Sequence, residues 1–215
     1  MLKIVVGKKF LPIFARGRKF LKFVFIMPKN LSDENFRTEW EYFKQNLVYT
    51  GLESHFDMAK LEQMMRYASC ALSADTGCAY PGALLYHVNL LTRLALRMSK
   101  MVSKSLPVDE KSLIKVCCLQ HLSKIEMYIP NDNQWEIEKR GLVYKFNETK
   151  GRLKFGERSL LNATNIGITF TPEEWEAMKA LDDEESNVKS KYFDSNLTMV
   201  VRLSNEIAYK IEREN

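Results

Sequence analysis

The clearest candidates for chemistry stand at the end of an apolar run. Residues 116–128 read VCCLQHLSKIEMY, so His121 ends the run and Lys124 follows three positions later. An imidazole can bind a metal or transfer a proton, and a lysine ammonium can contact a phosphate. A metal-binding histidine would be helped by an acidic neighbour, but the next residue is Leu122. From this stretch alone, His121 is either a ligand or a packed side chain.

The four cysteines point away from other chemistries. Cys117 and Cys118 lie in an apolar helical pattern, where cysteine behaves as a small buried hydrophobe. The sequence has no C-x-x-C pair, so we expect no structural zinc site. No base is positioned for a cysteine protease, and the phosphate-binding pattern G-x-x-x-x-G-K is missing. Reduced cysteines favour an intracellular protein, and the predicted location is the cytoplasm.

The positive charge is concentrated at the N-terminus. Residues 1–29 contain eight lysines and arginines, and no acidic residue precedes Asp33. The overall charge of +5 therefore does not indicate that the rest of the chain is basic, and nucleic-acid binding is not expected. Lys19 and Lys22 interrupt the apolar residues of 1–26, which excludes a signal peptide and a membrane-spanning helix. Residues 1–26 are either a poorly ordered extension or a cationic segment that contacts a membrane surface.

The remaining residues, 27–215, are predicted to form one helical domain. Apolar residues at helical spacing predict helices over about 32–51, 56–72, 84–102, 107–119 and 156–166, from 172 onward, and over 196–212. Residues 135–155 alternate between polar and apolar types, which predicts a hairpin with strands at 136–138 and 142–146. The predicted fold class is all-α, with a small β-hairpin insertion at about 135–155.

Five segments, taken in order, carry a resemblance to a known family. They are YPGALLYHVNLL (80–91), CCLQHLSKIEMY (117–128), KFGERSLL (154–161), TPEEWEAMKALDD (171–183) and LTMVVRLSNEIA (197–208). Together they resemble the HD-domain phosphohydrolase superfamily, in its small bacterial and phage branch with a hairpin insertion. The resemblance covers about residues 68–210. It implies an HD-like helical bundle in which a bound metal activates water to attack a phosphate ester.

The resemblance also assigns positions to individual residues. His87 and His121 match two metal-binding histidines, and Asn205 stands where the family's last aspartate ligand is expected. Lys124 and Arg158 match positions that could contact a phosphate. The alternatives from the residues alone stay open: His87 is a core histidine on an apolar helix face, and Arg158 belongs to a solvated basic surface.

Three further departures from the family pattern weaken the expected metal site. Leu122 replaces the aspartate of the His-Asp pair, and Phe155 and Leu181 replace histidines. Two neutral imidazoles and an amide lack the negative charge that anchors a hard cation, and we expect the three apolar residues to fill the cavity. The hypothesis is a catalytically degenerate HD domain that binds a nucleotide-like ligand or a protein partner and needs no cofactor. The alternative is a divergent metal-dependent phosphohydrolase that still binds a divalent ion.

Overall fold

A computed structural model describes residues 31–73, 78–185 and 194–214, so the predicted N-terminal extension lies outside the described residues. The described chain is mostly helical and has one small two-stranded sheet, which confirms the all-α class with a small β element. Among these residues, no helix has the length and apolar character required to cross a membrane.

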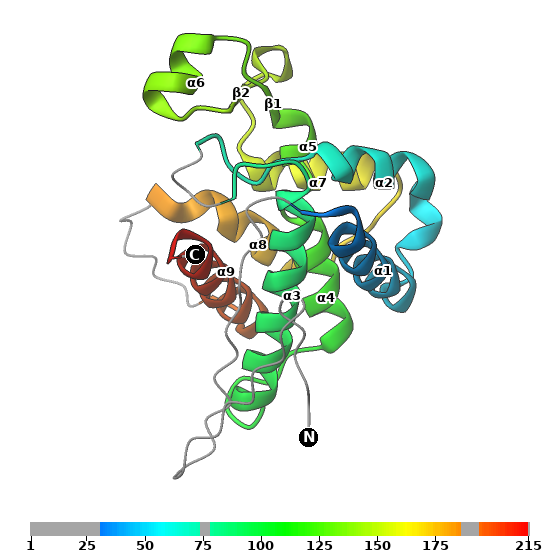
Figure 1. Cartoon of the computed structure of the whole chain (residues 1–215). Coiled ribbons are helices and arrows are strands. Elements are labelled where there is room, and N and C mark those ends of the chain that lie inside the picture. Colours follow the sequence, from blue (N-terminus) through cyan, green and yellow to red (C-terminus); the bar gives the residue numbers. More distant parts are fainter. Residues whose placement is uncertain (1–30, 74–77, 186–193, 215) are drawn as a thin grey trace, which may run out of the picture.

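The helices and strands follow one another along the chain as shown in Figure 1. The helices are α1 (Asp33–Thr50), α2 (Met58–Tyr67), α3 (Ala83–Val102), α4 (Glu110–Leu119), α5 (Lys124–Met127), α6 (Gln134–Arg140), α7 (Phe155–Asn165), α8 (Pro172–Lys179) and α9 (Asn196–Glu214). The strands are β1 (Tyr128–Pro130) and β2 (Tyr144–Phe146). Among the described residues, 3-10 turns cover Glu53–His55, Glu148–Lys150 and Ala180–Glu185.

Several helix ends agree with the sequence prediction and have clear local causes. The Ser32 side chain accepts a hydrogen bond from the backbone N–H of Asn35 at the start of α1. Gly51 ends that helix with φ 78°, a left-handed conformation that glycine adopts without strain. Thr171 and Glu174 form a capping box at the start of α8, where Pro172 is the first helical residue.

Helix α3 lies at the centre of the bundle. It packs against α1, α4 and α9, and α8 covers α9 and α4 from the other side, as the ribbon shows (Figure 1). The apolar faces of these helices form one buried core that extends from Phe36 in α1 to Ala208 in α9. Burial of this apolar surface is the main source of stability, and it fixes α3, α4 and α9 as the elements that carry the candidate site.

The insertion differs from the predicted hairpin. Residues 136–138 are not a strand but belong to helix α6, and the partner of β2 is β1, which precedes the predicted insertion. The two strands are antiparallel, with Tyr128 opposite Phe146. The predicted strand at 142–146 is confirmed over 144–146, and the prediction of a strand over 136–138 is wrong.

Local hydrogen bonds explain why residues 134–140 form a helix. The Asn133 side chain caps the backbone N–H of Glu136, and Gly141 ends the helix at φ 62°. Glu136 and Arg140 also form an ion pair across one helical turn. These caps and pairs outweigh the alternating pattern, which extends over too few residues to specify a strand.

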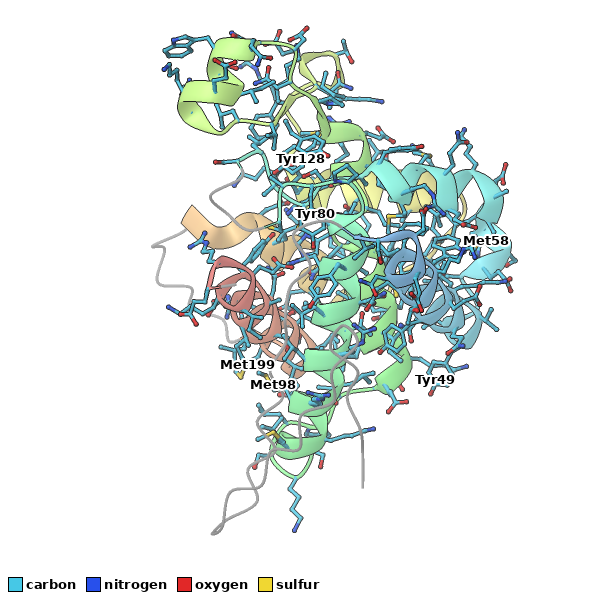
Figure 2. All side chains as sticks on the ribbon, in the orientation of Figure 1. Tyr49, Met58, Tyr80, Met98, Tyr128 and Met199 are labelled. Carbon is cyan, nitrogen blue, oxygen red and sulfur yellow. The ribbon has the colours of Figure 1, made fainter. Side chains whose placement is uncertain are left out.

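The insertion projects from the helical body (Figure 1) and is attached to it through aromatic side chains. Tyr128 lies where the projection meets the body, as Figure 2 shows. Its ring contacts those of Phe146 and Phe155, with centroid distances of 5.5 and 5.6 Å. Phe155 is the first residue of α7, so this aromatic cluster connects the insertion to the bundle.

Candidate functional site

Two histidines from different elements meet in the bundle core. His87 lies in the first half of α3, and His121 lies in the turn after α4; both side chains are fully buried. Their Nε2 atoms are 3.2 Å apart, and the rings are nearly perpendicular, at 88°. The structure therefore brings together the two histidines that the sequence analysis singled out.

Asn205 of α9 completes a triangle with these two histidines. Its Oδ1 lies 3.2 Å from Nε2 of His87 and 3.0 Å from Nε2 of His121. These three contacts cannot all be hydrogen bonds at once. If both Nε2 atoms carry a proton, the two N–H groups face each other, and if either lacks one, that nitrogen faces the amide oxygen as a second acceptor. The three atoms have the mutual spacing that donors around one cation have, although the oxygen comes from an uncharged amide.

Glu212 is a member of the site that the sequence analysis missed. The Nδ1 atom of His87 lies 2.9 and 3.0 Å from the two carboxylate oxygens of Glu212, which is fully buried. Positions 205, 209 and 212 of α9 are separated by four and three residues, so they share one helix face. This spacing relative to Asn205 is the sequence signal that would have identified both Tyr209 and Glu212.

The pKa values of the two buried imidazoles are shifted in opposite directions. Burial acts to lower the pKa of His87, but the negative charges of Cys70 and Glu212 outweigh it and raise the pKa to about 10. Burial lowers the pKa of His121 well below its ordinary value, and the nearby positive charges of His87 and Lys124 add to this effect. The cluster therefore pairs a charged His87 with a neutral His121.

Lys124 points into the core instead of toward a substrate. Only 4% of its surface is exposed, and its Nζ donates to the carbonyl oxygen of Cys70 at 2.9 Å and to the hydroxyl of Tyr209 at 2.8 Å. The ammonium also lies 5.3–5.9 Å from the ring centroids of Tyr128, Phe155 and Tyr209. Its ammonium is buried and bonded within the protein, so Lys124 does not present a phosphate contact at the surface.

Two cysteines form a second part of the site that the sequence analysis did not identify. The backbone N–H of Cys70 donates to the carbonyl of Cys78, and the two buried thiols are hydrogen-bonded to each other. No disulfide joins any of the four cysteines, all of which lie in the described part of the chain. Burial raises the pKa of the Cys70 thiol, but the bond from Cys78 and the charges of His87 and Lys124 outweigh it, so its pKa falls below the ordinary value.

The predicted phosphate contact Arg158 is buried and bonded within the protein, although its Nε has no hydrogen-bond partner among the described residues. Its guanidinium donates to the carbonyl of Lys150, and the side chain is buried. The helix N-terminus that precedes it is capped by Asp182, whose carboxylate accepts from the backbone N–H groups of Gly156 and Glu157 at 2.8 and 2.9 Å. A carboxylate of the protein thus occupies the position where the start of α7 would bind an external anion.

The three apolar replacements do not line a common cavity, contrary to expectation. Leu122 lies in the wall of an apolar pocket between α2 and α7, and Leu181 lies in the wall of a different pocket. Phe155 packs in the aromatic cluster with Tyr128 and Phe146. The histidine cluster is instead covered by Tyr209, whose ring centroid is 4.7 Å from that of His87.

The pocket that contains Leu181 lies directly beside the histidine cluster. It has a volume of about 310 Å³, and its wall includes Gln120, Arg202 and Asn205. The side chain of Gln120 is buried, and its Nε2 has no hydrogen-bond partner among the described residues. Arg202 is paired with Asp194 at the rim. A polar ligand of modest size would find an unused amide donor and a guanidinium here.

The residues present do not fit the metal centre of a phosphohydrolase. Three donor atoms have suitable spacing, but none of them carries a negative charge, and Leu122, the residue after His121, lines an apolar pocket. The buried ammonium of Lys124 further raises the cost of adding a divalent cation. We therefore derive no metal-dependent step from this cluster.

Comparison of the chain with protein-family models, curated proteins and solved structures returned no match.

Proposed function

We propose that this protein is a catalytically inactive HD-like domain that acts by binding. The proposal rests on the five ordered segments that resemble the HD superfamily and on the convergence of His87, His121 and Asn205 in the bundle core. In this account the histidine cluster is a polar element of the core that holds α3, α4 and α9 in register. It does not activate water.

The observation that carries the proposal is the orientation of Lys124. Its ammonium is buried and bonded to Cys70 and Tyr209. A lysine that stabilises a phosphate ester needs a free donor in a solvent-accessible cleft, because the substrate must reach it. Moving Lys124 to such a position would break these bonds and leave the polar atoms of Cys70 and Tyr209 unsatisfied in the core.

The favoured ligand is a nucleotide-like molecule in the pocket beside Asn205. This pocket offers the unpartnered amide of Gln120 and the guanidinium of Arg202, the groups that recognise a base edge and a phosphate. A protein partner is the other class of ligand, and the apolar pocket between α2 and α7 is the surface it would use.

A combined activity and binding measurement tests the proposal. Purified protein is assayed for phosphatase and phosphodiesterase activity on a panel of nucleotides with Mg, Mn, Fe, Co and Ni salts. We expect no turnover with any metal. The same panel is then screened for an increase in melting temperature, and a nucleotide that binds the pocket stabilises the wild type but not the Arg202→Gln variant.

Arg213→Gln is the matched control for this screen, because Arg213 is an exposed arginine farther along the same helix. It should respond to the ligand as the wild type does. Metal-dependent turnover that disappears in His121→Ala and persists in His55→Ala would contradict the proposal. His55 is the third histidine of the chain and is bonded to Ile166, away from the cluster.

A divergent metal-dependent phosphohydrolase is the second candidate, and one observation favours it. The triangle of His87, His121 and Asn205 has the spacing of three ligands of one ion. Glu212 also holds Nδ1 of His87 from the far side, as carboxylates do behind metal-bound histidines. This candidate predicts that His87→Ala and His121→Ala each abolish turnover, whereas the proposed binding domain has no turnover to lose.

A further inference from the structure

A second group of potential metal ligands lies beside the histidine triangle. One ligand atom each from Cys70, Cys78 and Glu212 lies within 4.8 Å of the others, and all three residues are buried. Two of the atoms are sulfurs and one is a carboxylate oxygen. The group is distinct from the triangle because its three members are outside it and only His87 contacts both.

The backbone brings the two cysteines close together. Cys70 follows α2, Cys78 precedes α3, and the backbone N–H of Cys70 donates to the carbonyl of Cys78 at 3.3 Å. At the start of α3, the backbone N–H of Gly82 also donates to the carbonyl of Ala68, which brings the end of α2 and the start of α3 together. This arrangement places both thiols against the face of α9 that carries Glu212.

Glu212 occupies a position that its own helix does not favour. It lies in the last turn of α9, where the helix dipole disfavours a negative charge, and its side chain is fully buried. A buried carboxylate needs compensation by a cation. His87 supplies one such contact, and the two sulfurs complete an environment of donors around the same point.

We propose that Cys70, Cys78 and Glu212 bind a zinc ion. Thiolate ligands select zinc over magnesium or calcium, and a carboxylate is an accepted third ligand of zinc. With Zn–S bonds of about 2.3 Å, two sulfurs of a tetrahedral site are roughly 3.8 Å apart. The observed group needs only a small inward movement of its side chains to reach that spacing.

The charges of the surrounding residues support a divalent ion. As zinc ligands, the two cysteines are thiolates, and with the carboxylate they contribute three negative charges. The ammonium of Lys124 lies 3.4 Å from the sulfur of Cys70 and compensates one of them. The imidazolium of His87, which is bonded to Glu212, compensates a second negative charge. A divalent cation more than compensates the third.

His87 acts as a positioning residue for this site. Its Nδ1–H donates to the carboxylate of Glu212 and fixes the direction of the oxygen that faces the sulfurs. The zinc would tie Cys70 and Cys78 to the C-terminal turn of α9. This inference does not require the domain to be inactive, because it uses none of the triangle's other members.

The first test measures zinc and its ligands in the intact protein. The chain is purified without a histidine tag under reducing conditions, supplied with one equivalent of zinc and then desalted. We expect about one zinc per chain by elemental analysis. Replacement of zinc by Co²⁺ should give strong thiolate-to-cobalt charge-transfer absorption in the near ultraviolet. This measurement on the wild type does not depend on whether any variant folds.

Serine variants then locate the ion. Cys70→Ser and Cys78→Ser should lose the zinc and the charge-transfer absorption, whereas Cys117→Ser should keep both. Cys117 is an equally buried cysteine in α4 and is the matched control. Circular dichroism confirms that each variant is folded.

Either of two results would overturn the proposal. The first is a wild type that retains no zinc after loading. The second is a bound ion that gives no thiolate absorption, persists in Cys70→Ser and is lost in His121→Ala, which would place it in the histidine triangle. Phosphohydrolase turnover is not a readout of this test, so its outcome is independent of the proposed function.

Discussion

The histidine triangle and the cysteine–carboxylate group lie next to each other and share His87, yet they differ in the property that matters for a cation. The triangle has three atoms at 3.0–3.2 Å and no negative charge. The cysteine–carboxylate group is more widely spaced, within 4.8 Å, and its members can supply three negative charges. As a metal site, the triangle is favoured by the spacing of its atoms, and the cysteine–carboxylate group is favoured by its negative charge.

This difference shows why donor geometry is an incomplete guide to metal binding. A buried divalent ion loses its hydration, and neutral donors replace only part of that stabilisation. At Asn205 an amide oxygen completes the shape of the triangle without the negative charge that a carboxylate would supply. The following predictions test whether charge or spacing decides the behaviour of each group.

Glu212→Gln should have the largest effect on stability, measured in chelator-treated protein. It removes the carboxylate that faces the charged His87 and leaves a buried imidazolium without its partner. Breaking a buried pair in this way costs about 3 kcal/mol or more of the free energy of unfolding. Urea denaturation of the variant and the wild type measures the difference.

Glu214→Gln is the control for that variant, because Glu214 is two residues away on α9 and its side chain is 64% exposed. Its free energy of unfolding should change by less than about 0.5 kcal/mol. Equal effects of the two substitutions would show that the buried carboxylate contributes nothing specific.

Lys124→Met should have the next largest effect. It keeps most of the apolar stem but leaves the carbonyl of Cys70 and the hydroxyl of Tyr209 without their donor. We expect a loss of about 2 kcal/mol in the free energy of unfolding. Lys210→Met, at an exposed position on α9, should leave stability nearly unchanged. A Lys124→Met protein as stable as the wild type would contradict the assignment of this ammonium to the core.

The low pKa of His121 predicts a decrease in the free energy of unfolding at mildly acidic pH. Its folded-state pKa lies well below the unfolded value of 6.5, so below pH 6.5 the unfolded chain binds a proton that the folded protein does not. Stability from this group is therefore complete above pH 6.5 and falls by up to about 1.4 kcal/mol per pH unit below it. Denaturation of chelator-treated protein between pH 7 and about pH 5 measures the slope, in a range chosen above most carboxyl titrations.

His121→Gln should reduce this slope, and His55→Gln should retain it, since His55 is exposed and bonded to a backbone carbonyl. A slope that is unchanged in His121→Gln would assign the acid sensitivity to another group.

Asn205→Asp should have the smallest effect, and it adds a negative charge to the triangle without changing its shape. We expect its affinity for Mn²⁺ to exceed that of the wild type by about tenfold, which corresponds to about 1.4 kcal/mol. Leu122→Asp should give no such gain, because Leu122 faces the apolar pocket between α2 and α7. Isothermal titration of both variants checks this pair. A gain in Leu122→Asp alone would show that the position of that side chain has been misassigned.

Much of the helical framework is predictable from local sequence. The spacing of apolar residues and the caps at Ser32 and Thr171 define helices whose ends agree with the structure to within a few residues. The strand at 136–138 was predicted wrongly because a short alternating pattern carries less information than the Asn133 cap and the Gly141 terminus.

The candidate site was only partly predictable. His87, His121 and Asn205 could be placed together through a family resemblance, and the structure confirms their convergence. Cys70 and Cys78 lie in a stretch of sequence with no periodic pattern, and their partner Glu212 is more than 130 positions away along the sequence. Their association is a consequence of tertiary packing between α3 and α9, which local patterns do not encode.

X-ray absorption spectroscopy at the zinc edge tests most directly the claim that charge and not spacing selects the metal site. The zinc-loaded wild-type protein is measured under reducing conditions. The account predicts two sulfur neighbours at about 2.3 Å, from Cys70 and Cys78, together with a shorter oxygen distance from Glu212. A first shell made only of nitrogen and oxygen at about 2.0–2.2 Å would place the ion in the histidine triangle and contradict the account.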